Sequence, residues 1–439
     1  MAQRSELLAL ARDELRQLAE EGYDIAHLEK ELEAAADHGP EESCAACYAV
    51  LDATGLAIRQ DFPFEEPSAL EAIRAARPEG PRRLPVKLSE EQLWDKILGG
   101  WLGRCAGCLL GKPVEGWPAE RIRQTLEAIG RYPLDGYWPE APGLNPELQP
   151  GGPPEWRRGK IAAMPRDDDM DYPIVGLIAV EEHGPELTSR DIARTWLARL
   201  PYHCVYTAER AAYRNLVNDR WPPESATYRN PYREWIGAQI RADIWGWVSP
   251  GQPERAAELA HRDACLSHVK NGIYGEMFFA ALLAAAFATD DVDEIIEAGL
   301  SEIPRNCRLR EAILDAAEWS KSEESFEQTL ARIQEKYGSY HRVHTINNAA
   351  LIIMGLYYGQ GDFAKTVCTT VMGGWDTDCT GATAGSIVGV MRGASGLPAE
   401  WIEPLNDTLH SAVVGFSRCS ISELAKRTYE LAKRLAEQQ

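Results

Sequence analysis

Apolar residues recur along most of this 439-residue chain every three to four positions. Between residues 5 and 20, for example, Leu7, Leu8, Ala11, Leu15 and Leu18 form one stripe, as in an amphipathic helix. Strict alternation of apolar and polar residues, the pattern of a half-buried strand, is scarce. The sequence therefore predicts an all-α fold.

The pattern divides the chain near residue 85. Residues 1–85 contain predicted helices at 5–20, 25–36 and 67–76 and end in the Pro- and Gly-rich run 78–85, which has the composition of a linker. We expect a helical N-terminal extension (1–85) followed by one larger helical domain (86–439). Its helices are predicted from Ser89 through Leu98 and at 172–183, 189–199, 207–217, 233–245, 253–264, 276–288, 291–299, 308–319, 325–336, 345–358, 362–371, 380–392 and 421–437.

Composition excludes some classes of protein. A net charge of −21 argues against a nucleic-acid partner, because phosphate binding needs surface Lys and Arg. The longest apolar run, 277–288, is too short to span a bilayer, and the N-terminus lacks the apolar core of a signal peptide. We therefore expect a cytoplasmic protein with no membrane partner. Its ten cysteines include two C-x-x-C pairs, 44/47 and 105/108, which we interpret as buried thiols of a reducing compartment.

Two acidic clusters stand far apart in the sequence, at Asp167, Asp168 and Asp169 and at Asp376 and Asp378. Each precedes a helix-like apolar stretch. Carboxylates held close together repel, and a hard divalent cation such as magnesium, calcium or manganese relieves that repulsion with oxygen ligands. The clusters therefore predict a metal-dependent enzyme, if the fold brings them together.

Two series of glycines, each with a spacing of four residues, favour an arrangement in which the two acidic clusters lie close together. The first runs from Gly99 to Gly111 and the second from Gly381 to Gly393. Glycines at this spacing lie along one side of a helix, and each costs about 1 kcal/mol relative to Ala in a helix interior. We predict that the two helices pack closely and bring the acids together; the alternative is tight packing with no ligand.

Three motifs, in this order and spacing, resemble a known family. They are 103–115 (GRCAGCLLGKPVE), 167–170 (DDDM) and 374–385 (GWDTDCTGATAG). The chain resembles the ADP-ribosylglycohydrolase superfamily over about residues 92–395. The resemblance implies an all-α fold with two divalent cations at its centre, magnesium or alternatively manganese.

The resemblance also implies roles for individual residues. Metal ligands would be Asp168, Asp169, Asp376 and Asp378, with Asp167 in the place of a family Thr. Glu115 corresponds to the family glutamate near the scissile bond, and Ser267-His268 resembles a Thr-His pair that precedes a helix lining the substrate cleft. We add Asn271 and Glu276, which follow His268 at the start of that helix, as predicted substrate-binding residues.

Three positions depart from the family pattern. Cys108 replaces an Asp, Met170 replaces a Thr, and Cys379 replaces a Thr ligand, for which Thr380 is the next candidate. These changes leave the metal pair in place but make the substrate less certain than the family name implies.

The predicted reaction is hydrolysis of an N- or O-glycosidic bond. Two cations would orient the ribose hydroxyls while water attacks the anomeric carbon, with Glu115 or Asp168 as acid or base. The partner would be a ribosyl-containing small molecule or an ADP-ribosylated substrate. The alternatives are hydrolysis of a nucleoside-like or other glycoside, and a non-catalytic relative that only binds metal or ligand.

Overall fold

The computed structural model describes residues 2–36 and 40–437, and in this part the fold is all-α, as predicted. Its sheet structure consists of one short antiparallel hairpin, β1 (Thr408–His410) and β2 (Arg418–Ser420). None of the described helices combines the length and apolar character needed to cross a bilayer.

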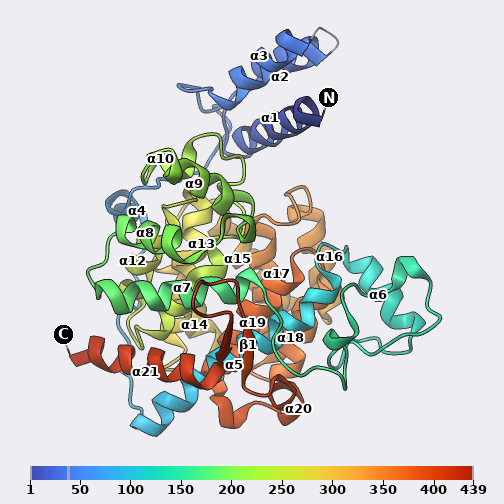
Figure 1. The fold of residues 1–439 in the computed structure, drawn as a ribbon, viewed down its shortest axis with the longest axis vertical. Coiled ribbons are helices and arrows are strands. Elements are labelled where there is room, and N and C mark those ends of the chain that lie inside the picture. The colour runs from blue at the N-terminus through green and yellow to red at the C-terminus, as the bar shows by residue number, and fades with distance from the viewer. Residues whose placement is uncertain (1, 37–39, 438–439) are drawn as a thin grey trace.

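In the N-terminal part, the first three helices group together at one end of the molecule, whereas the fourth lies against the large body (Figure 1). The helices of this part are α1 (Ala2–Glu20), α2 (Ala26–Ala36), α3 (Pro40–Leu51) and α4 (Leu70–Ala76). The sequence pattern did not reveal α3. Side chains of α1, α2 and α3 enclose a small apolar core of their own, which includes Ala11, Leu32 and Val50. The boundary placed at residue 85 stays a prediction.

The remaining helices form the large body (Figure 1). They are α5 (Glu90–Gly111), α6 (Ala119–Ala128), α7 (Asp168–His183), α8 (Ser189–Arg199), α9 (Thr207–Val217), α10 (Glu224–Thr227), α11 (Ala242–Trp247), α12 (Pro253–Ala264), α13 (Lys270–Ala285), α14 (Val292–Leu300), α15 (Arg308–Ser322), α16 (Phe326–Tyr337), α17 (Thr345–Gly359), α18 (Phe363–Met372), α19 (Thr377–Arg392), α20 (Ala399–Ile402) and α21 (Ile421–Glu437). Most match a predicted helix closely.

The first part of the helix predicted at 233–245 is wrong. Residues 233–238 form turns, and regular helix begins only with a 3₁₀ turn at Gln239–Arg241 and α11. The Ile236 N–H donates to the carbonyl of Val343 at 2.8 Å, in a distant loop. That bond replaces a helical one, so tertiary pairing overrides the local periodicity.

The two glycine series face each other across α5 and α19, as predicted. A Cβ built on Gly103 would lie within 3.0 Å of the Gly385 carbonyl oxygen, and one on Gly107 within 3.0 Å of the Gly381 oxygen. A Cβ built on Gly385 or Gly381 would in turn lie within 3.0 Å of the carbonyl oxygen of Gly103 or Gly107, so the helix backbones touch directly. Only residues without a side chain permit this approach. It brings the last residue of α5, Gly111, against Thr377, the first residue of α19.

Buried ion pairs join the N-terminal helices to the body. Arg233 binds Glu14 at 2.8 Å and Glu21 at 2.6 Å, and all three side chains are less than 9% exposed. Arg308 lies between Glu66 at 2.7 Å and Glu234 at 2.8 Å. Buried charges are retained only when they are paired, so each arginine depends on carboxylates contributed from before residue 85.

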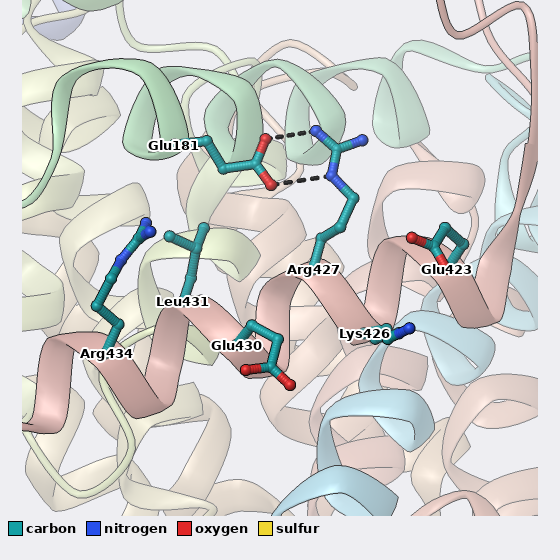
Figure 2. Close-up of a pocket in the computed structure, with 7 residues that line it drawn as sticks. All are labelled: Glu181, Glu423, Lys426, Arg427, Glu430, Leu431 and Arg434. Carbon is teal, nitrogen blue, oxygen red and sulfur yellow. Dashed lines mark hydrogen bonds and ion pairs between the residues drawn. The ribbon is translucent and has the colours of Figure 1, made fainter.

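The C-terminal helix α21 packs beside α7. Figure 2 shows Arg427 of α21 reaching Glu181 of α7, and Arg427 Nε donates to Glu181 Oε1 at 2.9 Å. The depression around this pair is small, about 170 Å³, and is lined mainly by charged side chains of both signs. We interpret it as a solvated helix contact that supports α7, whose other end carries the first acidic cluster.

Candidate metal centre

The structure brings the two acidic clusters together. Within the described residues, three groups of side chains place their ligand atoms within 4.8 Å of one another. The groups are Cys108–Asp167–Asp169, Asp169–Asp378–Cys379 and Glu115–Asp376–Asp378. Asp169 is shared by the first two groups and Asp378 by the last two, so the groups form one continuous cluster.

The start of α7 positions the first acids. The Asp167 side chain caps the helix by accepting the Asp169 N–H at 3.1 Å. Capping by Asp is common because its carboxylate satisfies an otherwise unpaired helical N–H. The same cap turns the Asp169 carboxylate inward, where it is 1% exposed.

The start of α19 positions the second acids. Gly374 (φ +78°) and Trp375 (φ +63°) both adopt left-handed backbone conformations just before the helix. The Thr377 hydroxyl donates to the Gly111 carbonyl at 2.8 Å, and the Asp376 N–H donates to Asn348 Oδ1 at 3.2 Å. These bonds fix the loop against α5 and α17, so that Asp376 and Asp378 both face the cluster.

Two basic residues of the first glycine motif hold the first acids. Arg104, fully buried, donates to Asp169 Oδ1 at 2.9 Å and to Asp243 Oδ2 at 2.7 Å. It also donates to the backbone carbonyl of Asp169 at 2.8 Å. Lys112 forms an ion pair with Asp167. These cations offset only part of the negative charge of the cluster.

We expect Arg104→Met to lower the free energy of unfolding by about 3–5 kcal/mol, because it leaves Asp169 and Asp243 buried without a partner. Chemical denaturation measures this loss. The control is Arg123→Met, whose ion pair with Glu127 is half exposed (51% and 50%) and should contribute about 0–1 kcal/mol. Equal effects of the two substitutions would contradict a special role for Arg104.

The cluster has the features of a cation site. Asp169 Oδ2 and Asp378 Oδ1 are buried and have no hydrogen-bond partner. Burial, followed by the charges of Glu115 and Asp376, raises the pKa of Asp378 well above its usual value. Burial and the charge of Glu115 likewise raise the pKa of Asp376 to about 7. Divalent ions with oxygen ligands would supply the missing partners and the missing positive charge, so the residues fit the predicted metals.

Comparison with known proteins identifies the family. The ADP-ribosylglycohydrolase family model matches residues 89–438. The chain belongs to the ADP-ribosylglycohydrolase family. An uncharacterized protein of Archaeoglobus fulgidus is 25% identical over 345 residues, 76% of this chain and 96% of the relative. A solved ADP-ribosylglycohydrolase-related protein complex aligns with 78% of this chain and 99% of its own, with a TM-score of 0.47 and 18% identity.

Membership in the ADP-ribosylglycohydrolase family suggests a glycosidic hydrolase, and one of the two predicted catalytic carboxylates, Glu115, belongs to the cluster. Glu115 is exposed and shares a group with Asp376 and Asp378. Although Glu115 is exposed as a residue, the protein around its carboxyl partly desolvates it, and this desolvation and the charge of Asp167 raise the pKa of Glu115, while Lys112 and Arg342 lower it.

Two further residues predicted from the ADP-ribosylglycohydrolase motifs lie beside these groups. Asp168 is half-buried and outside the three groups, and burial and the charges of Asp167 and Asp169 raise its pKa. The Thr380 hydroxyl donates within its own helix to the Thr377 carbonyl at 3.4 Å. Ligand roles for Asp168 and Thr380 stay predictions.

The three predicted substrate-binding residues are buried and bind other parts of the protein. His268 contacts the Ser267 hydroxyl at 2.8 Å through Nδ1. Asn271 donates to Glu234 at 2.8 Å, and Glu276 accepts from the Trp245 indole at 2.8 Å. All three are at most 1% exposed. These contacts position helices, and a role in substrate binding stays a prediction.

Sequence reasoning missed several residues of the site. Arg104 stands as the one charge in an apolar, glycine-rich stretch, which is itself a sign of a buried acidic partner. Asn348, in α17, had no feature that could have singled it out. The two cysteines of the cluster were noted only as departures from the family pattern.

Proposed function

We propose that this protein is a metal-dependent glycohydrolase that cleaves the N- or O-glycosidic bond of a ribosyl or ADP-ribosyl substrate. The observation that carries the proposal is the cluster around Asp169 and Asp378, each with a buried carboxylate oxygen that has no protein partner. Carboxylates kept in that state need a cation, and the family is one of glycohydrolases.

The residues divide into two adjoining ligand sets that share Asp378. Asp376, Asp378 and Glu115 form one set, and Asp169 and Asp378 belong to the other. When bound, the two divalent ions would supply the positive charge that orients the sugar hydroxyls and polarises water. Arg104 and Lys112 keep the carboxylates of Asp169 and Asp167 in place.

Glu115 is the proposed general base. It is the exposed member of the cluster, so it can reach a substrate that approaches from solvent. A raised pKa moves a carboxyl towards the range in which it exchanges protons near neutral pH. Glu115 would accept a proton from the water that attacks the anomeric carbon, through an oxocarbenium-like transition state. Asp168 is the alternative base.

The exposed Arg342 favours a substrate that carries phosphate. Its guanidinium lies beside Gly116, next to the proposed base, because a Cβ built on Gly116 would be 3.3 Å from Arg342 Nε. Arginine binds phosphate oxygens with planar, bidentate geometry. An ADP-ribosyl group would place such oxygens near the ribose, whereas a nucleoside or a simple glycoside would not.

The test is sugar release with Mg²⁺ from a panel of ADP-ribosyl-arginine, ADP-ribosyl-serine, nucleosides and simple glycosides. We expect release from an ADP-ribosyl substrate, abolished by EDTA and restored by added Mg²⁺. Release only from a nucleoside or simple glycoside would favour the alternative hydrolase. Tight binding without turnover would identify a non-catalytic relative, and full activity in metal-free protein would refute the proposal.

Glu115→Gln should lower kcat by about 10²–10⁴-fold, the usual contribution of general acid–base catalysis. The matched control is Glu120→Gln, an exposed glutamate near the start of α6 that should leave kcat unchanged. Calorimetric titration with Mg²⁺ separates loss of the base from loss of a ligand. Unchanged kcat in Glu115→Gln would transfer the role to Asp168.

A further inference from the structure

The acidic cluster is not chemically uniform. One group, Glu115–Asp376–Asp378, contains only carboxylates, whereas each of the other two contains a cysteine, Cys108 or Cys379. Both thiols are buried, at 0% and 8% exposure. Among the cysteines that the structure describes, only these two belong to a group with the spacing of a metal site.

The two thiols differ in what surrounds them. Cys108 is grouped with Asp169 and with Asp167, whose carboxylate already binds Lys112 and caps α7. Cys379 is grouped with Asp169 and Asp378, the two carboxylates whose buried oxygens lack a partner. Cys379 is therefore the thiol whose group contains both carboxylates with an unpartnered buried oxygen, whereas the group of Cys108 contains one of them.

We propose that Asp169, Asp378 and Cys379 bind a borderline-soft divalent transition ion such as Zn²⁺, while the all-carboxylate group takes a hard ion such as Mg²⁺. Thiolates select zinc-like ions, and oxygen-only sites suit magnesium and manganese. On binding, the ion takes the place of the thiol proton, which passes to solvent. This inference rests on the metal centre of the proposed function but concerns which metal ion each of the two groups of ligands binds.

The experiment is titration of Co²⁺, a spectroscopic substitute for Zn²⁺, into the full-length protein in the presence of Mg²⁺. We expect a sulfur-to-cobalt charge-transfer band in the near ultraviolet that saturates at one equivalent. Cys379→Ser should lose the band and bind Zn²⁺ at least about 10–100-fold more weakly, since even outer partners of metal ligands contribute that much. Affinity for Mg²⁺ should change little.

Matched controls use other buried thiols. Cys368→Ser, in α18 and outside the three groups, should keep the band. Cys108→Ser should also keep it. A band lost in Cys108→Ser but kept in Cys379→Ser would overturn the assignment, as would the absence of any band in the unmodified protein.

A second measurement does not depend on a variant that folds. X-ray absorption at the zinc edge of the Zn²⁺-loaded protein should show a Zn–S distance of about 2.3 Å. A coordination shell of oxygen and nitrogen alone would overturn the proposal. Sulfur ligation without hydrolysis of any substrate would refute the proposed function only, whereas hydrolysis with Mg²⁺ and no sulfur ligation would refute this inference only.

Discussion

Replacing Asp378 with Asn should abolish both hydrolysis and the binding of divalent ions by the cluster. Asp378 belongs to both of the groups that form the proposed ion positions, so its loss removes a ligand from each of them. We expect cation affinity, measured by calorimetry with Mg²⁺ or Mn²⁺, to fall by about 100-fold or more, the upper range seen for changes around metal ligands.

The same substitution should stabilise the metal-free protein. The Asp378 carboxylate is 5% exposed and has an oxygen without a partner, and burial raises its pKa well above normal. An uncharged Asn removes that repulsion, and we expect the free energy of unfolding in EDTA to rise on the order of 1–3 kcal/mol.

Opposite effects on stability and activity distinguish a metal ligand from a structural residue. The control is Asp61→Asn, an 82% exposed carboxylate in the N-terminal part, which should change neither quantity. Retention of full cation affinity in Asp378→Asn would contradict the assigned role, and lower stability in EDTA would contradict the account of charge repulsion.

Gly107→Ala should destabilise the fold strongly, although it adds a single methyl group. Ala is the better helix former by about 1 kcal/mol, so propensity alone predicts stabilisation. The added Cβ, however, would lie within 3.0 Å of the Gly381 carbonyl oxygen, and backbone cannot move aside as a side chain does. Overpacking of this kind costs about 1–3 kcal/mol and occasionally more.

The separation of α5 and α19 should also alter the site. Asp378 moves with α19, whereas Glu115 follows α5 along the chain, so a wider gap between the helices would weaken cation binding as well as folding. Thermal unfolding and calorimetry measure the two effects. In the control Gly136→Ala, the nearest atom to the new Cβ is 3.7 Å away, and both effects should vanish. If the Gly107→Ala protein unfolds at the same temperature as the unmodified protein and binds divalent cations with the same affinity, the helices can separate without consequence.

Periodicity and spacing could predict most of the fold and the core of the site. The helices α12, α14, α15, α16 and α18 follow clear apolar stripes, and the facing glycines predicted which pair would approach most closely. The convergence of the acids could be predicted because carboxylates repel one another, and a bound cation explains why two separate helix starts both carry them.

Other features depend on partners that a linear sequence does not show. Residues 233–238 have helical periodicity, but the backbone of Ile236 pairs with Val343 instead. Cys108 belongs to a C-x-x-C pair, and that spacing draws attention to Cys105 rather than to the carboxylates that lie beside it. His268 stands in the place of a family histidine, and Asn271 and Glu276 follow it at the start of a helix, yet each is enclosed by local contacts.

The ion pairs between the N-terminal helices and the body have a consequence for truncated versions of the protein. The family match begins at residue 89, which invites removal of everything before it. Such a truncation would take away Glu14, Glu21 and Glu66, and leave Arg233 without either of its carboxylates. The region that matches the family thus contains an arginine, Arg233, whose carboxylate partners both come from the leading segment, and the shortened chain would have to fold with that charge unpaired.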